Sequence, residues 1–450
     1  MVDRIEAPPA TPLDGRADVI LDLVGDDHAP PRGVHLALRC GGLPVLDGAV
    51  AAILDDRLPV LEASLSVDGV ARPFARWPVA IEDRRSALRS ATLILGRAAH
   101  LAVAAVEALL AAADPAEATL HLAEVPVTAP ARPGIGLEFF ASALAAKIAA
   151  RLSRLAGRRP PTWATAWRRR AGGGDPFRPD RDPTPFRRLP EDGARFFADP
   201  FLFTEGGRLH LFVEEFPFAT GKGVISHAVL GPDGDFGPPT PVLEMDCHLS
   251  YPFVFAHDGH IFMIPETSGR RTVELWVAER FPDRWVRHSI LLDDVDVGDA
   301  TIVEIDGTWW MFGATRAEST SSWEALSLWS APSPYGPWRR HAHDPAIVDV
   351  RAARPAGHVF RSAEGWCRPV QDSARGYGSG LAVARIDELT PTTHRETVIR
   401  RFATPPPLLG LHTWNRASLG DDLFEVIDVF ADLTAFGDTR PLDLADTDGR

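Results

Sequence analysis

Acidic residues stand at both ends of a repeated pair of short apolar strands in the C-terminal half of the chain. A strand that begins at Asp199 is followed by a turn and by a second strand that ends at Glu215, and the same order recurs from Tyr251 to Glu266 and from Asp299 onward. In a hairpin, the start of the first strand and the end of the second lie at the same edge. Carboxylates gathered there could act as general acid, general base or nucleophile. We therefore expect catalysis by Asp199, Glu215, Glu266 and Asp299.

Other polar and aromatic residues stand at or near the ends of the same strands, and we expect them to bind substrate. They are Tyr251, Arg354, Arg368, Asp372, His412 and Trp414. Carboxylates accept hydrogen bonds from sugar hydroxyls and aromatic rings cover sugar C–H faces, so the predicted ligand is a sugar or glycan. Arg354 favours a substrate with an anionic group, such as a phosphate or a uronate, although a salt bridge between repeats explains it equally well.

Structural roles compete with these functional interpretations. Asp199 precedes a proline and could be a strand-entry or turn residue, and Asp299 could hold backbone amides between repeats. Asp372 could form an ion pair between repeats, and His412 could hold a water molecule or a cation. Glu214 alternates to the face opposite Glu215 and is expected to be structural.

The hairpin repeats five times, with a period of about 50 residues that is typical of a β-propeller. Each hairpin has an apolar strand, a turn that contains Gly or Asp, and a second apolar or aromatic strand. The hairpins are Asp199–Phe216, Tyr251–Thr267, Asp299–Thr315, Arg354–Asp372 and His412–Asp428. The predicted fold is mainly β: a five-bladed β-propeller preceded by a smaller α/β domain. A β-sandwich of unrelated hairpins is the alternative.

Closure of the ring requires strands from before the first hairpin. The fifth repeat has no room for an outer pair of strands after its hairpin, whereas Thr162–Arg169 and Pro185–Leu189 read as strands. We expect these two segments to complete the fifth blade, which would remove exposed sheet edges.

Four regions follow from the change of composition along the chain. Residues 1–155 read as an α/β domain, because short apolar runs at Asp18–Val24 and Gly33–Leu38 precede long helical patterns at Arg84–Ala113 and Leu137–Leu155. Residues 156–190 are predicted to be a linker that contributes the outer strands of blade five. The propeller is expected over residues 191–435, and a tail over 436–450.

Composition narrows the function classes. The 450 residues carry a formal net charge of -14, which argues against nucleic acid as a partner because such binding needs a basic footprint. Three widely spaced cysteines do not form a disulfide framework or a thiolate metal cluster. We expect no metal, no cofactor and no membrane span. The N-terminal residues lack the apolar core of a secretion signal, so the expected location is cytoplasmic.

Two families of known proteins resemble the C-terminal half. The segments ADPFLF, FVEEF, YPFVF, MIPETS, DATI, RPAG, RPVQD and GLHT resemble the propeller at the N-terminus of plant glucosamine inositolphosphorylceramide transferases. The openings Ala198-Asp199-Pro200 and Asp299-Ala300-Thr301 resemble, more distantly, the arabinanase and β-xylosidase group of glycoside hydrolases. That resemblance implies that Asp199 is the general base and that Asp299 tunes a pKa and orients the sugar.

The sequence departs from both families at points that matter for function. The hydrolase group has an acidic Glu at the opening of blade four, where this chain has Ala353-Arg354-Pro355, so Glu215 or Glu266 would have to replace that acid. In the plant proteins a glycosyltransferase domain follows the propeller. We therefore expect either cleavage or transfer of a glycosyl group by the propeller, or a non-catalytic glycan-binding or scaffold module that works with a separate glycosyltransferase partner.

The N-terminal region weakly resembles a degenerate formyltransferase domain. The order of an apolar strand, the Gly33-Val34-His35-Leu36 strand and the long helix from Arg84 fits that family, and His35 would correspond to its histidine. This resemblance implies a third hypothesis, formyl transfer to an amino sugar by the N-terminal domain. An asparagine partner for His35 is not evident in the sequence.

Overall fold

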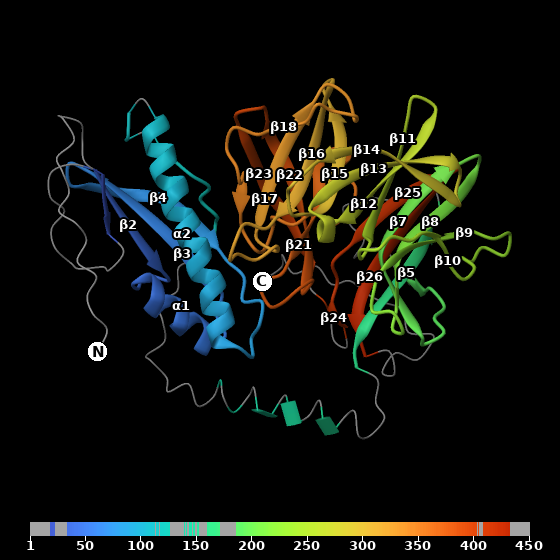
Figure 1. Ribbon diagram of the computed structural model, residues 1–450, viewed down its shortest axis with the longest axis horizontal. Coiled ribbons are helices and arrows are strands. Elements are labelled where there is room, and N and C mark those ends of the chain that lie inside the picture. The colour runs from blue at the N-terminus through green and yellow to red at the C-terminus, as the bar shows by residue number, and fades with distance from the viewer. Residues whose placement is uncertain are drawn as a thin grey trace.

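The computed structural model describes most of the chain (Figure 1). The described residues are 19–22, 34–112, 114–116, 118–126, isolated positions between 139 and 152, 160–171, 186–402, 404 and 408–432. The tail expected over 436–450 and most of the helix expected over Leu137–Leu155 lie outside these ranges.

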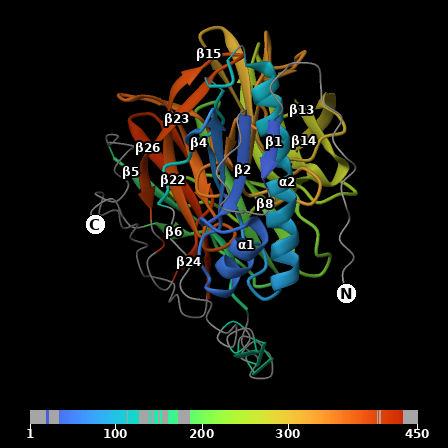
Figure 2. The ribbon, with the colours of Figure 1, turned by 90° about the vertical axis from the view of Figure 1, so that its left-hand side faces the viewer.

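The N-terminal part is one layer of four strands with two helices (Figure 2). The strand order is β1-β2-β3-β4, in which β1 runs parallel to β2 and the other pairs are antiparallel. Buried and partly exposed residues alternate along β2, as expected for a strand with one face on a core. Helix α2 begins after Ser86, whose hydroxyl accepts a hydrogen bond from the N–H of Arg89. The elements are β1 (Val19–Asp22), β2 (Val34–Cys40), α1 (Val45–Leu54), β3 (Val60–Val67), β4 (Val70–Pro78) and α2 (Ala87–Ala111).

The rest of the described chain forms five antiparallel sheets, which we number I to V. Sheet I holds β7 (Arg195–Glu205), β8 (Arg208–Pro217), β9 (Val224–Val229) and β10 (Thr240–Leu243). Sheet II holds β11 (Ser250–His257), β12 (His260–Thr267), β13 (Thr272–Arg280) and β14 (Arg284–Leu292). Sheet III holds β15 (Val297–Ile305), β16 (Thr308–Thr315), β17 (Ala325–Ala331), β18 (Arg339–Arg340) and β19 (Ile347–Val348). Sheet IV holds β20 (Phe360–Ser362), β21 (Gly365–Asp372), β22 (Gly380–Leu389) and β23 (His394–Phe402).

Sheet V joins strands from two distant parts of the sequence. It holds β24 (Leu408–Gly410), β25 (Trp414–Leu419), β26 (Asp422–Ala431), β5 (Thr162–Arg170) and β6 (Arg187–Arg188). Strand β5 pairs with β26 along its whole length, from Thr162 opposite Ala431 to Arg170 opposite Leu423, and β6 pairs with β5. The segments expected to complete the fifth sheet therefore lie in it, and the mainly β class is confirmed.

Hydrogen bonds link each sheet to the next in chain order, and sheet V to sheet I. The N–H of Tyr251 in sheet II donates to Asp199 of sheet I, and the N–H of Trp414 in sheet V donates to the carbonyl of Ala356, beside sheet IV. The link between sheets V and I runs from the N–H of Asp199 to Asp428. Because these bonds are buried, they fix neighbouring sheets relative to one another.

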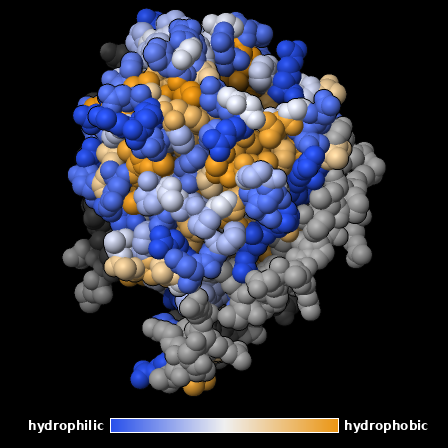
Figure 3. Space-filling view, turned by 90° about the vertical axis from the view of Figure 1, so that its right-hand side faces the viewer, coloured by the Kyte–Doolittle hydropathy of each residue, from blue (hydrophilic) through white to orange (hydrophobic). Residues whose placement is uncertain are grey.

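The N-terminal layer packs on sheet III through a buried ion pair. Arg97 of α2 lies 2.8 Å from Glu324, and both side chains are 2% exposed. The same carboxylate accepts a hydrogen bond from the N–H of Ala80, and the layer's hydrophobic core continues into Ala325 and Val348. The other side of the molecule, which faces the viewer in Figure 3, carries apolar patches between polar side chains.

Helix α2 is also long and apolar enough to cross a membrane by length and composition alone, with a mean hydropathy of 1.7 over its most apolar window. The sequence prediction of no such segment did not anticipate this. One third of that window is buried in the structure, and Arg97 lies within the helix in the ion pair with Glu324. These contacts fit a helix packed on protein.

Candidate functional site

The first strands of sheets I, II and III begin with the same β-bulge. In each, two residues stand opposite one residue of the second strand: Asp199 and Pro200, Tyr251 and Pro252, and Asp299 and Ala300. The first residue of each pair has a positive φ, of 46°, 45° and 56° respectively. Non-glycine residues rarely adopt this conformation, and bulges of this kind redirect a side chain beside functional sites.

The bulges bring together an acidic cluster, defined here as the carboxylates of Asp199, Glu214, Glu266, Asp299 and Asp428 with the cations Arg354 and His412. The atoms of Asp199, Asp299 and His412 are almost completely buried, with exposures of 5%, 2% and 3%. Buried charges are costly unless they are paired and hydrogen-bonded, so the partners of each member show what it can do.

Asp199 lies at the junction of sheets I, II and V. One carboxylate oxygen accepts a hydrogen bond from the hydroxyl of Thr413 at 2.8 Å, and the other accepts one from the N–H of Tyr251 at 3.2 Å. His412 Nε2 lies 3.6 Å away. Burial raises the pKa of Asp199 above its ordinary value, although the charge of His412 acts against this. Asp199 is therefore a buried carboxylate with both oxygens hydrogen-bonded and a raised pKa.

His412 is charged at neutral pH. Burial alone would lower its pKa, but the carboxylates of Asp428 and Asp199 outweigh burial and raise the pKa of His412 to about 9. Its Nδ1 lies 2.6 Å from Asp428, which also accepts the backbone N–H groups of Asp199, His412 and Thr413. The carboxylate of Asp428 thus fixes both the imidazole and the opening of sheet I.

Asp299 is bound by Arg354 and Gln371. Arg354 donates to both carboxylate oxygens, from Nε at 2.6 Å and from Nη2 at 3.2 Å, and Gln371 Nε2 donates at 2.9 Å. Burial acts against the charge of Arg354, but Asp299 and Glu266 raise its pKa well above the ordinary value. The guanidinium also lies against Glu266 and Ser322, so protein groups already bind it on several sides. The reason to expect an anionic substrate group at Arg354 therefore disappears, and the alternative of a salt bridge between sheets holds.

The two neighbouring glutamates of β8 lie on the opposite sides of the strand from those expected. Glu215 is 1% exposed, forms an ion pair with Arg195 and accepts a hydrogen bond from Ser226 at 2.6 Å. Glu214 instead belongs to the cluster, because the charges of Asp199 and His412 act on the pKa of its carboxyl. The Glu214 carboxylate also lies 3.2 Å from His248. The structure thus places Glu214 in the cluster and Glu215 outside it, the reverse of the expected arrangement.

Three other predicted residues lie outside the cluster. Arg368 pairs with Glu396 and donates to two backbone carbonyls, and Asp372 pairs with Arg401. Trp414 is buried in the hydrophobic core of sheets IV and V. The partners of Arg368 and Asp372 line a separate groove of about 950 Å³ between the N-terminal layer and sheets III and IV. Substrate contacts by these three residues are not supported.

Of the other predicted residues, Tyr251 lies beside the cluster and Glu266 lies in it, and both have structural contacts. The hydroxyl of Tyr251 bridges Thr301 at 2.9 Å and the N–H of Gly357 at 2.8 Å, so it ties sheets II and III to the segment before sheet IV. Glu266 accepts hydrogen bonds from the N–H of Asp299 and the hydroxyl of Ser268. Burial would raise the pKa of Glu266, but Arg354 and these donors lower it, so Glu266 is ionised.

Aromatic side chains cover one side of the cluster. Tyr377 is 38% exposed, lies 5.3 Å from the guanidinium of Arg354 and meets the ring of His412 edge-on at 5.3 Å. Trp163 of β5 stacks on His412 with centroids 3.9 Å apart, and Trp323 lies 5.5 Å from Tyr377. Carboxylates beside exposed rings suit sugar binding. Sequence reasoning missed these three rings because they lie outside the hairpin ends.

Asp199, His412 and Asp428 could also hold a metal ion. One ligand atom from each lies within 4.8 Å of the others, and all three side chains are buried. The carboxylate and imidazole donors fit a divalent cation, which would bind where the charged imidazole now balances the two carboxylates. The sequence did not lead us to expect this grouping.

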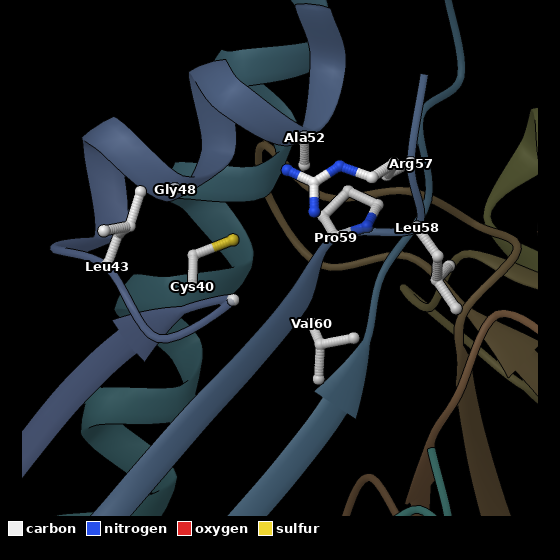
Figure 4. A pocket seen from close by; sticks show the side chains of 9 residues that line it. Cys40, Leu43, Gly48, Ala52, Arg57, Leu58, Pro59 and Val60 are labelled. Carbon is white, nitrogen blue, oxygen red and sulfur yellow. The ribbon is translucent and has the colours of Figure 1, made fainter. Parts of the chain in front are cut away.

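The N-terminal layer has a small cavity of its own (Figure 4). It is lined by residues such as Cys40, Arg57 and Val60 and measures about 20 Å³, which is room for about one water molecule. His35 lies in β2 and does not line it. This cavity is too small for a formyl donor, so it lends no support to formyl transfer.

Known proteins align with the C-terminal part of this chain. The family model described as "Glucosamine inositolphosphorylceramide transferase 1, N-terminal" matches residues 190–421, just over half of the chain. The chain belongs to this family. Proteins called glucosamine inositolphosphorylceramide transferase 1 are 32% identical over 227 residues in Oryza sativa subsp. japonica and 31% identical over 226 residues in Arabidopsis thaliana.

These family members are much longer proteins. The aligned part covers 49% of this chain but only 30% of the rice protein and 29% of the Arabidopsis protein. Among solved structures, the Cellvibrio cellulosa α-L-arabinanase complexed with arabinohexaose is 14% identical with a TM-score of 0.39, and covers 56% of this chain and 90% of that chain. An exo-1,5-α-L-arabinanase from a bovine ruminal metagenomic library has a TM-score of 0.38 at 12% identity, covering 56% and 92%. Superposition at this level carries no argument about activity.

Proposed function

We propose that the five sheets form a five-bladed β-propeller whose acidic cluster binds a saccharide and cleaves or transfers a glycosyl group. The observation that carries this proposal is the environment of Asp199. This buried carboxylate is held on both oxygens in a strained bulge, and it is accompanied by a charged histidine whose ring meets Trp163 and Tyr377. Strain and burial of this kind are expected where a side chain must be reactive.

The role of Asp199 follows from its contacts. In hydrolysis it would take a proton from an attacking water, and in a covalent mechanism it would attack the anomeric carbon itself. Burial raises the pKa of Asp199, and the charge of His412, 3.6 Å away, acts in the opposite direction and favours the ionised form that either role needs. Asp299 cannot play this part, because Arg354 and Gln371 occupy its oxygens.

The charge of the site favours a neutral or cationic sugar. Five carboxylates surround two cations, and the guanidinium of Arg354 is already bound by the protein. An amino sugar would satisfy this excess of negative charge, and glucosamine stands in the name of the aligned rice and Arabidopsis proteins. A sugar phosphate or a uronate would be repelled.

The test is a panel of p-nitrophenyl glycosides, including the 2-amino-2-deoxyglucosides and neutral hexosides and pentosides, with Asp199→Asn as the variant. Turnover of a panel member by the wild type, and its loss by at least about 10²-fold in Asp199→Asn, is the expected result. Asp283→Asn, which alters an exposed carboxylate on sheet II, is the control that keeps activity. Unchanged turnover in Asp199→Asn contradicts the proposal.

A second function is favoured by one observation. The position where the glycoside hydrolase pattern needs an acid holds Arg354, whose bond to Asp299 is structural. This favours a non-catalytic glycan-binding module that works beside a separate glycosyltransferase. Saccharide binding by the wild type, measured by calorimetry and without turnover of any panel member, would select this function.

A further inference from the structure

One glutamate of the acidic cluster can hold a proton at neutral pH. Glu214 stands opposite Ala198, directly before the bulge that carries Asp199. Its side chain is 9% exposed, and the charges of Asp199 and His412 act on it. Burial raises the pKa of Glu214 to about 7, against a hydrogen bond from His248 that lowers it. A general acid works best with a pKa near the working pH.

The other carboxyls of this region cannot fill that role. Arg354 and hydrogen-bond donors keep Glu266 ionised, and Asp299 is bound to Arg354 on both oxygens. Glu215 is committed to Arg195 and Ser226. Neither glutamate that the sequence suggested as an acid can therefore fill the role, which leaves Glu214, the residue expected to be structural.

His248 decides which oxygen of Glu214 carries the proton. The N–H of Gly223 donates to His248 Nδ1 at 2.9 Å, so in the neutral imidazole the hydrogen is on Nε2. Nε2 lies 3.2 Å from Glu214 Oε1 and donates to it. The proton of the neutral carboxyl is then left on Oε2. Gly223 permits this contact, because a Cβ there would lie 2.4 Å from the carbonyl oxygen of Leu249 and 2.7 Å from the His248 ring.

We propose that Glu214 is the proton donor of the acidic cluster and that His248 is the positioning residue that orients it. This inference rests on the proposed function of the cluster. As the bond from the anomeric carbon to the leaving oxygen breaks, Glu214 Oε2 gives its proton to that oxygen and becomes a carboxylate. Asp199 takes the proton of the water whose oxygen bonds to the anomeric carbon. One proton then returns from Asp199 to Glu214 through solvent, so the enzyme is restored.

The first test follows the proton directly. The variants are made in a Glu191→Gln background, because burial raises the pKa of Glu191 to about 7 as well. Carbon-13 NMR of this protein, labelled at the glutamate side-chain carboxyls, should show one resonance that titrates near pH 7. It should be missing in Glu214→Gln and present in Glu215→Gln. In His248→Ala it should titrate at higher pH, because the hydrogen bond that lowers the pKa is gone. A titration that survives in Glu214→Gln, or that His248→Ala does not move, overturns the inference.

The second test separates this inference from the proposed function. A 2,4-dinitrophenyl glycoside needs no protonation of its leaving group, whereas a phenyl glycoside does. Glu214→Gln should lower kcat/KM by about 10²–10⁴-fold for the phenyl substrate and by less than about 10-fold for the dinitrophenyl substrate. Asp199→Asn should lower both. Equal loss for both substrates in Glu214→Gln contradicts the donor role alone. A normal titration with no turnover of any glycoside contradicts the proposed function alone.

Discussion

Arg354 donates two hydrogen bonds to Asp299 across the boundary between sheets III and IV, from Nε at 2.6 Å to one carboxylate oxygen and from Nη2 at 3.2 Å to the other. Both side chains are less than 10% exposed. At the position where the hydrolase pattern has an acidic Glu, this chain therefore has an arginine that forms a two-point ion pair. A buried pair of this kind adds little net stability over an apolar pair, but loss of one partner is expensive because the other charge stays buried.

Arg354→Met should therefore lower the free energy of unfolding by about 3–5 kcal/mol, measured by urea denaturation. The double variant Arg354→Met with Asp299→Asn should regain most of that loss, since no charge is then left unpaired. Arg280→Met breaks an exposed pair with Asp283 and should leave the free energy of unfolding nearly unchanged. A loss below about 1 kcal/mol in Arg354→Met would show that the ion pair is not buried in solution.

Stability should fall as the pH rises above neutrality. The pKa of His412 is about 9 in the folded chain and about 6.5 when unfolded, so the folded state binds the extra proton. The stabilisation is complete below about pH 6.5 and is lost as the pH rises through about 9. Asp428→Asn removes the carboxylate closest to His412, so the pKa of His412 and the loss of stability should both shift to lower pH. Proton NMR of His412 and urea denaturation between pH 6 and pH 10 measure these effects, and an unshifted His412 titration would contradict the argument.

The two neighbouring glutamates should separate stability from ligand binding. Glu215→Ala removes the acceptor of Ser226 and one of the two carboxylates that pair with Arg195, and it should lower the free energy of unfolding by about 1–2 kcal/mol with unchanged saccharide affinity. Glu214→Gln should change the affinity for the same saccharide and leave stability nearly unchanged. Calorimetric titration and thermal unfolding of both variants give the comparison. If Glu215→Ala weakens binding and Glu214→Gln does not, the sequence interpretation of this pair would be restored.

Tyr377→Ala should weaken saccharide binding by about 10-fold, because an aromatic face contributes about 0.5–1.5 kcal/mol beyond its buried area. Tyr335→Ala is the matched control, since Tyr335 is also 38% exposed but packs against His257 and His288 of sheet II. Calorimetry on both variants decides the matter. Equal affinities in the two variants would place the sugar elsewhere.

Glu324→Gln should loosen the N-terminal layer while sheets I to V keep their protection. The change leaves Arg97 buried opposite a neutral amide, and it weakens the hydrogen bond from Ala80. Hydrogen exchange followed by mass spectrometry should show faster exchange in β4 and α2. Glu304→Gln, at an exposed position of β15 in the same sheet, is the control. Uniformly faster exchange through all sheets would mean that the two parts unfold together.

The sequence was sufficient to predict the strands and their pairing. The five predicted hairpins lie where the first two strands of sheets I to IV and strands β25 and β26 lie, although their ends differ by up to six residues, as at Arg354 against Phe360. The strand candidates near Thr162 and Pro185 were correctly placed beside the last hairpin. These predictions rest on local patterns, namely apolar runs and turn residues, that need no knowledge of the third dimension.

The orientation of individual side chains could not be predicted in the same way. Alternation along β8 fixes that Glu214 and Glu215 point in opposite directions, but not which of them points to the cluster. The bulge at Asp199 and Pro200 adds a residue to the facing strand, and its presence is not visible in the apolar pattern. Arg368 failed for a related reason, because its partner Glu396 lies on another strand whose register the sequence does not state.

Because sheet V joins strands from two distant parts of the sequence, the site is completed only late in synthesis of the chain. Strand β5 emerges from the ribosome about 250 residues before β26, so it waits without its partner while sheets I to IV are made. The partners of Asp199 are also made much later than Asp199, after almost the same number of residues; they are Thr413, His412 and Asp428. A shortened chain that stops before β26 would hold four sheets, an unpaired strand edge and a carboxylate without its histidine. The acidic cluster is therefore complete only in chains that have been made through to residue 428.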